Sequence, residues 1–94
     1  MAAWTFITNH GAVLISIYQH EMITTRELAH ELGITERSVI RIINELETEG
    51  YITKQRAGRL NHYETNRNVA LRRKALRDIA VGDLLDVLTP DLPS

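Results

Sequence analysis

The stretch TRELAHELGITERSVIRIINELETEGYI, residues 25–52, holds two helical patterns separated by a glycine. Residues 24–27 match a capping box, in which the Thr24 hydroxyl accepts from the amide of Glu27 and the Glu27 carboxylate accepts from the amide of Thr24. The short helix that begins here ends at Gly33, because glycine reaches the left-handed C-cap conformation without steric cost. Thr35 then caps a longer helix, which we expect over residues 35–49.

Both helices place aliphatic side chains on one face. In the longer helix these residues follow the i, i+3, i+4, i+7 spacing of a buried stripe, and they are Val39, Ile42, Ile43 and Leu46. The shorter helix has Leu28, Ala29 and Leu32 on its inner face, with the small Ala29 where two helices cross closely. The two helices are therefore expected to share one core.

The flanking sequence predicts three more elements. A first helix capped by Thr8 or Asn9 runs to about His20, preceded by Trp4, Phe6 and Ile7 as an arm packed on the core. After Gly50 the apolar period falls from 3.6 to about 2, and YITKQR and RLNHYET flank a turn at AG, which indicates a β-hairpin over 51–65. A last helix is expected over about residues 79–88, ended by the prolines that follow.

This order of elements predicts a winged helix-turn-helix with an added C-terminal helix, a mainly α fold with a small β-hairpin (α+β). We expect a DNA-binding domain over residues 1–68 and a C-terminal extension over 69–94, which dimerises or packs on the first helix. The stretch quoted above resembles bacterial and archaeal winged helix-turn-helix transcriptional regulators of the MarR/ArsR-like kind. The resemblance covers about residues 9–65.

The composition fits a single small domain. The chain has 94 residues, of which 44% are hydrophobic, and a formal net charge of −1. It has no apolar run long enough to cross a membrane, no basic leader and no cysteine, so we expect a cytoplasmic protein without disulfides or a membrane association.

The small net charge hides an uneven distribution. Residues 51–77 have eight basic side chains against one acidic side chain, whereas residues 1–50 have three against seven, and residues 78–94 have four aspartates and no base. A basic band in an otherwise acidic chain indicates a surface that faces a polyanion, although such a band can also be a solvated face.

The resemblance implies that the helix over 35–49 enters the major groove of double-stranded DNA and that the hairpin wing lies on the backbone or in the minor groove. On the residues alone, the outer face of that helix presents Arg37, Arg41 and Asn44, with Thr35 and Ser38 near its start. Arginine can bind guanine and asparagine can bind adenine through paired hydrogen bonds. Glu45 is spaced to pair with Arg41. The predicted wing contacts are Lys54, Arg56, Arg59 and His62.

Other functions have less support in the residues. We expect no catalytic site, because no nucleophile and base, phosphate loop or metal cluster is visible, and no metal or cofactor, because the four histidines are scattered. A winged helix that binds another protein is the alternative, favoured by Glu36 and the acidic end of the third helix. We also expect a homodimer through an apolar side of the last helix formed by Leu84, Leu85, Val87 and Leu88.

Overall fold

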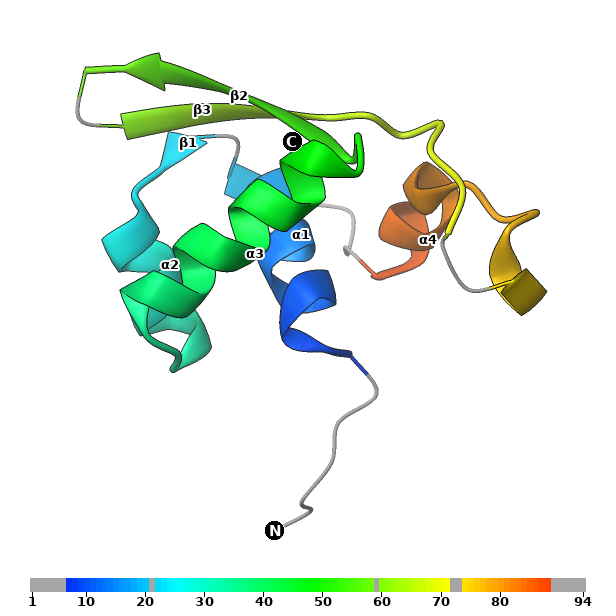
Figure 1. Ribbon diagram of the computed structural model, residues 1–94, viewed down its shortest axis with the longest axis horizontal. Coiled ribbons are helices and arrows are strands. Elements are labelled where there is room, and N and C mark those ends of the chain that lie inside the picture. The colour runs from blue at the N-terminus through cyan, green and yellow to red at the C-terminus, as the bar shows by residue number, and fades with distance from the viewer. Residues whose placement is uncertain (1–6, 21, 59, 72–73, 89–94) are drawn as a thin grey trace, which may run out of the picture.

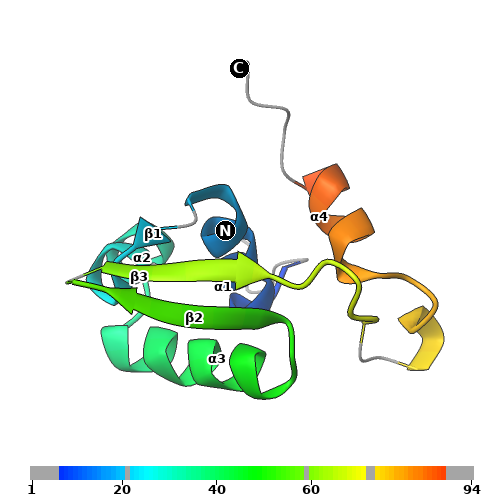
Figure 2. The same cartoon turned by 90° about the horizontal axis from the view of Figure 1, so that it is seen from above.

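Three helices lie beneath one face of a small antiparallel sheet, and a fourth helix lies at the end of the sheet opposite the hairpin tip (Figures 1 and 2). The computed structural model describes residues 7–20, 22–58, 60–71 and 74–88. The elements are α1 (Asn9–His20), β1 (Met22–Ile23), α2 (Thr25–Leu32), α3 (Glu36–Thr48), β2 (Ile52–Ala57), β3 (Leu60–Thr65), a 3-10 turn (Lys74–Leu76) and α4 (Val81–Leu88). The predicted α+β winged helix is confirmed.

The helix-turn-helix begins and ends where its capping residues predict. The amide of Glu27 donates to the Thr24 hydroxyl at 3.0 Å, and the amide of Thr24 donates to the Glu27 carboxylate at 3.1 Å. The bond from the Thr24 amide, and a second that the Thr24 hydroxyl donates to the same carboxylate at 2.9 Å, lower the pKa of Glu27 from its usual value. Gly33 has φ of 68° at the C-cap of α2, and Thr35 caps α3 by accepting from the amide of Ser38.

The sheet has one strand more than the sequence predicts. The strand order is β1-β3-β2, and Met22 of β1 pairs with His62 of the central strand β3. A two-residue strand is too short to show a period of 2, so the sequence has no alternation that could reveal it. Its two residues nevertheless alternate in exposure, since Ile23 is buried in the core and Met22 is exposed.

The hairpin turn lies one residue later than predicted. Ala57 pairs with Leu60, so Ala57 belongs to the strand β2 and the loop begins at Gly58 rather than at Ala57. Gly58 has φ of 65°, which glycine adopts without strain and which the first loop position of a tight hairpin requires. Arg59 lies outside the residues that the structure describes.

Helix α4 begins at Val81, two residues later than predicted. The reason lies in the backbone before it, where the amide of Leu71 donates to the carbonyl of Ile79 at 3.0 Å and the amide of Val81 donates to the carbonyl of Val69 at 2.8 Å. Residues 79–81 therefore form a short bridge with residues 69–71, and Ile79 lies ahead of the helix.

One hydrophobic core joins α1, α2, α3, the sheet and α4. The predicted apolar side of the last helix is divided in the structure, because Leu85 is 1% exposed in this core whereas Leu84 is 37% and Val87 is 81% exposed. The core of the chain takes Leu85, whereas Leu84 and Val87 remain on the surface. Tyr51 and Tyr63 are buried, and Trp4 and Phe6 of the predicted N-terminal arm lie outside the described residues.

Candidate nucleic-acid interface

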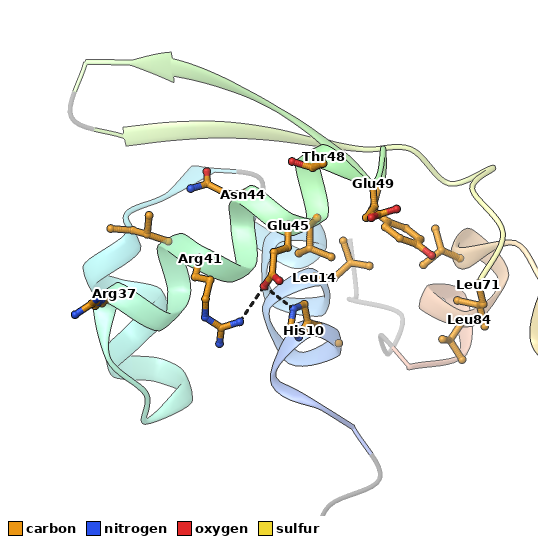
Figure 3. Close-up of a pocket in the computed structure, with 15 residues that line it drawn as sticks. His10, Leu14, Arg37, Arg41, Asn44, Glu45, Thr48, Glu49, Leu71 and Leu84 are labelled. Carbon is orange, nitrogen blue, oxygen red and sulfur yellow. Dashed lines mark hydrogen bonds and ion pairs between the residues drawn. The ribbon is translucent and has the colours of Figure 1, made fainter. Parts of the chain in front are cut away.

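Helix α3 has a polar face opposite its buried stripe. Arg37, Arg41 and Asn44 are all exposed there, and Figure 3 shows Asn44 directed toward the sheet, with Arg41 directed the other way. The same face exposes Ile40, 45% accessible, which the sequence analysis did not single out. The sequence indicates that Ile40 is exposed, because Ile40 falls outside the i, i+3, i+4 spacing of the buried stripe.

The start of α3 is held by short-range hydrogen bonds. The Thr35 hydroxyl accepts from the Ser38 amide at 3.1 Å and donates to the Ser38 hydroxyl at 2.9 Å. Glu36 accepts a 2.8 Å hydrogen bond from the hydroxyl of Thr25 at the start of α2. The Thr25–Glu36 bond joins the starts of α2 and α3, which also pack on each other through the common core.

Arg41 and His10 share one carboxylate oxygen of Glu45. The Arg41 guanidinium donates to Glu45 Oε1 at 2.9 Å, which confirms the pairing expected from the spacing, and His10 Nε2 lies 3.0 Å from the same oxygen (Figure 3). All three side chains are about half exposed. Exposed pairs of this kind stabilise a fold by only about 0–1 kcal/mol, so Arg41 can exchange Glu45 for another acceptor at little cost.

The predicted wing residues are distributed over both faces of the hairpin. Lys54 pairs with Tyr63 and Arg56 pairs with Asn61, and paired residues share a face. Since Tyr63 is buried against the helices, Lys54 and Arg56 extend from the helix-facing side of the edge strand β2. His62 alternates with Tyr63 and therefore lies on the opposite face, half-buried.

Arg67 belongs to the basic band in the sequence but not to an exposed cationic surface. Its guanidinium donates to both carboxylate oxygens of Asp86 in α4, at 2.8 and 2.7 Å, and to the hydroxyl of Tyr18 in α1 at 2.6 Å. The hydrogen bonds to Asp86 raise the pKa of Arg67, and the same bonds lower the pKa of Asp86. Arg67 thus joins α4 to α1, so this member of the basic band is used within the chain.

An apolar groove of about 830 Å³ lies between α1, α3 and α4. Leu14, Leu71 and Leu84 line it, and Glu45 and Glu49 lie at its edge (Figure 3). Arg37, Ile40, Arg41 and Asn44 border its α3 side, so the groove adjoins the candidate DNA-facing surface.

Other kinds of site find no support in the part of the chain that the structure describes. Within residues 7–20, 22–58, 60–71 and 74–88, no three His, Asp or Glu side chains come together as a metal site would require. None of the described helices is both long enough and apolar enough to cross a membrane.

The geometry is that of a winged helix-turn-helix with an exposed, cationic third helix, and a comparison of families agrees. The model of the MarR family matches residues 8–57, and the chain belongs to this family. Its members are DNA-binding transcription regulators, which confirms the MarR side of the resemblance.

A curated relative is also similar to part of the chain. The chain is 37% identical over 59 residues to the uncharacterized protein MJ1254 of Methanocaldococcus jannaschii. The matched segment covers 62% of this chain and 13% of that protein. The chain therefore spans only a small part of the length of this relative.

Proposed function

We propose that the chain is a sequence-specific regulator that binds double-stranded DNA, with α3 in the major groove and the β2–β3 wing on the backbone or in the minor groove. The observation that supports this most strongly is the exposed face of α3, where Arg37, Arg41 and Asn44 lie together opposite the buried stripe. Arg37 and Arg41 suit guanine, and Asn44 suits adenine. Thr35 and Ser38 lie at the helix start, where hydroxyls and amides meet phosphate.

The wing would supply contacts that depend on charge rather than on sequence. Lys54 and Arg56 lie on one face of β2, and Arg59 follows Gly58 in the sequence. A narrow minor groove has a strong negative potential that attracts arginine. His62 is on the other face of the hairpin, so in this proposal it contacts the backbone only if the central strand also approaches the DNA.

Selection of bound sequences from random duplex DNA tests the proposal directly. Purified protein should enrich a defined sequence, and a palindrome would indicate a two-fold dimer. Binding to that sequence should weaken with salt, with a log–log slope of about −5 if six phosphates are neutralised per dimer. A slope near zero, or no enriched sequence, would exclude DNA as the partner.

A protein partner is the second candidate, and the groove between α1, α3 and α4 favours it. Leu14, Leu71 and Leu84 provide an apolar floor. The rim has charges of both signs, from Glu45, Glu49, Arg37 and Arg41, and would suit an apolar peptide that also has both. Because the groove adjoins α3, a variant that fills the centre of the groove and leaves Arg37 and Arg41 unchanged distinguishes peptide binding from DNA binding. Leu14 is buried in α1 and Leu84 belongs to the dimer surface proposed below, so Leu71→Trp, at a half-buried position in the groove, is the cleaner variant. Unchanged DNA affinity in this variant would support the DNA-binding proposal.

We further propose a homodimer in which the C-terminal extension, residues 69–94, forms the interface through α4. Leu84 and Val87 are exposed on α4, which lies at the opposite end of the sheet from the wing tip (Figure 2). A two-fold axis near α4 would bury these side chains in both copies and place two α3 helices about 34 Å apart on one side of the DNA.

Sedimentation equilibrium at micromolar protein tests the dimer. The variant Leu84→Glu with Val87→Glu should be a folded monomer, because both side chains are exposed in the single chain. A monomeric wild type would overturn the dimer, and a dimeric double variant would move the interface away from α4.

A further inference from the structure

Ile40 is an apolar side chain in the middle of the polar face of α3. It is 45% exposed, three residues after Arg37 and four before Asn44, and all three residues border the same groove. Residues three and four apart are neighbours on a helix surface. Arg37, Ile40 and Asn44 therefore form one row along the side of α3 that is opposite the core.

The fold itself does not require isoleucine at this position. The buried stripe of α3 is complete without it, since Val39, Ile42 and Ile43 are almost fully enclosed. A β-branched residue is also a weaker helix former than alanine, lysine or glutamate, which are the usual choices for an exposed helix position. A single exposed aliphatic side chain is ordinary on a protein surface, so the position of Ile40 between two predicted base-reading residues is the informative feature.

The major groove offers such a side chain one apolar partner. Each base pair presents hydrogen-bond donors and acceptors there, and only thymine adds a methyl group. Arg37 and Asn44 suit guanine and adenine, so an aliphatic residue between them completes a row that can recognise three different base edges. We propose that Ile40 is a specificity-determining residue that contacts the 5-methyl group of a thymine. This proposal rests on the DNA-binding function proposed above.

The helix geometry also places this thymine. Four residues of α-helix rise about 6 Å, and successive bases along a strand are about 3.4 Å apart. For a helix that lies along the groove, the thymine contacted by Ile40 should be one or two base-pair steps from the adenine bound by Asn44.

Replacing thymine by deoxyuridine tests this contact, because the change removes the methyl group and leaves the hydrogen-bonding edge unaltered. In the sequence selected from random DNA, each thymine is replaced singly and the affinity of wild type and Ile40→Ala is measured. Wild type should bind about fourfold more weakly when the thymine at one position of either half-site is replaced, the value expected for one buried methyl or methylene group. Ile40→Ala should bind the thymine and deoxyuridine duplexes equally.

Ile79→Ala is the matched control, since Ile79 is 39% exposed but lies ahead of α4 rather than on α3. It should keep the fourfold preference for thymine. If wild type is insensitive to every replacement, or if Ile40→Ala keeps the same sensitivity, the assignment of Ile40 is overturned. If no sequence is enriched at all, the proposed function fails together with it. Equal urea midpoints for wild type and Ile40→Ala show that folding does not cause the difference.

Discussion

The helix-turn-helix, residues 24–50, and the C-terminal segment, residues 66–88, are built from contacts of different range. The bonds that begin α2 and α3 join residues three apart, Thr24 to Glu27 and Thr35 to Ser38. The bonds that hold α4 join residues 19 and 49 apart, Arg67 to Asp86 and Arg67 to Tyr18. The first segment is specified by its own sequence, and the second takes its form only when the rest of the chain is in place.

The two segments also use arginine differently. Arg41 on α3 holds a half-exposed carboxylate through one hydrogen bond. Arg67 holds a carboxylate through two hydrogen bonds and a tyrosine through a third. A count of charges along the sequence does not distinguish these two arginines. In the structure Arg41 is available to a ligand, whereas Arg67 joins α4 to α1.

The largest expected effect tests whether the C-terminal segment shares the core of the helix-turn-helix. Leu85→Ala should lower the free energy of unfolding by about 2–5 kcal/mol, because the side chain is 1% exposed in the common core. Leu84→Ala, on the same helix but 37% exposed, should cost much less. Urea unfolding measures both. A loss below about 1 kcal/mol for Leu85→Ala would mean that α4 unfolds separately from the rest.

Two glycines, one in each segment, should respond differently to substitution. Gly33 has φ of 68° and open space around its α-carbon, so Gly33→Ala should cost about 1–2 kcal/mol and Gly33→Asn less, since asparagine tolerates this conformation. At Gly82 a β-carbon would lie 2.6 Å from the Arg67 β-carbon and 2.9 Å from its carbonyl oxygen. Gly82→Ala should cost about 1–3 kcal/mol, and Gly82→Asn should be worse.

Thermal or urea unfolding of the four variants decides between the two causes. We expect Gly33→Asn to be more stable than Gly33→Ala, and Gly82→Asn to be less stable than Gly82→Ala. If asparagine were also better than alanine at position 82, backbone conformation rather than the close approach of α4 to Arg67 would explain that glycine.

The functional contrast between Arg41 and Arg67 can be measured on DNA. Arg41→Ala should weaken binding to the preferred duplex by about 1–3 kcal/mol and binding to random duplex much less. Arg67→Met should leave the preference for one sequence unchanged, while lowering the unfolding midpoint because α4 loses its link to α1. Equal losses on both duplexes for Arg41→Ala would show that this arginine contacts phosphate and not a base.

The parts of the fold that could be predicted are those with local signals. The Thr24 capping box, the αL glycine at position 33 and the stripe of α3 each need only a few neighbouring residues, and each is present in the structure. The strand β1, the position of the hairpin turn and the start of α4 depend on pairing with distant backbone. The residues of each of these segments contain no pattern that identifies the distant segment with which it pairs.

The same distinction applies to the predicted interface. The helical period alone places Arg37, Arg41 and Asn44 on one face, and all three are exposed on that face of α3. The wing residues were grouped by charge, and strand alternation separates His62 from Lys54 and Arg56. Ile40 is not among the predicted DNA contacts, because those contacts are identified by charged and polar side chains. Whether any of these residues contacts DNA remains a prediction.

The smallest expected effect is on stability in acid, and it compares one carboxylate from each segment. Hydrogen bonds lower the pKa of Glu27 in the capping box and of Asp86 beside Arg67. A carboxyl group whose pKa is lower in the folded state stabilises the fold fully above its unfolded pKa and loses this contribution as the pH falls through the folded pKa. The losses should therefore begin near the ordinary values of 4.5 for Glu27 and 3.8 for Asp86 and continue below them.

Urea unfolding as a function of pH separates the two carboxylates. Glu27→Gln and Asp86→Asn should each be less stable than wild type near neutral pH and approach it in acid, so that each has a flatter pH profile. Arg67→Met should flatten the profile as Asp86→Asn does, because it removes the donor that lowers the pKa of Asp86. It should leave the contribution of Glu27 intact, since that carboxylate is bonded by Thr24 within its own helix turn. A profile for Arg67→Met as steep as that of wild type would show that the link between α4 and α1 does not depend on this ion pair.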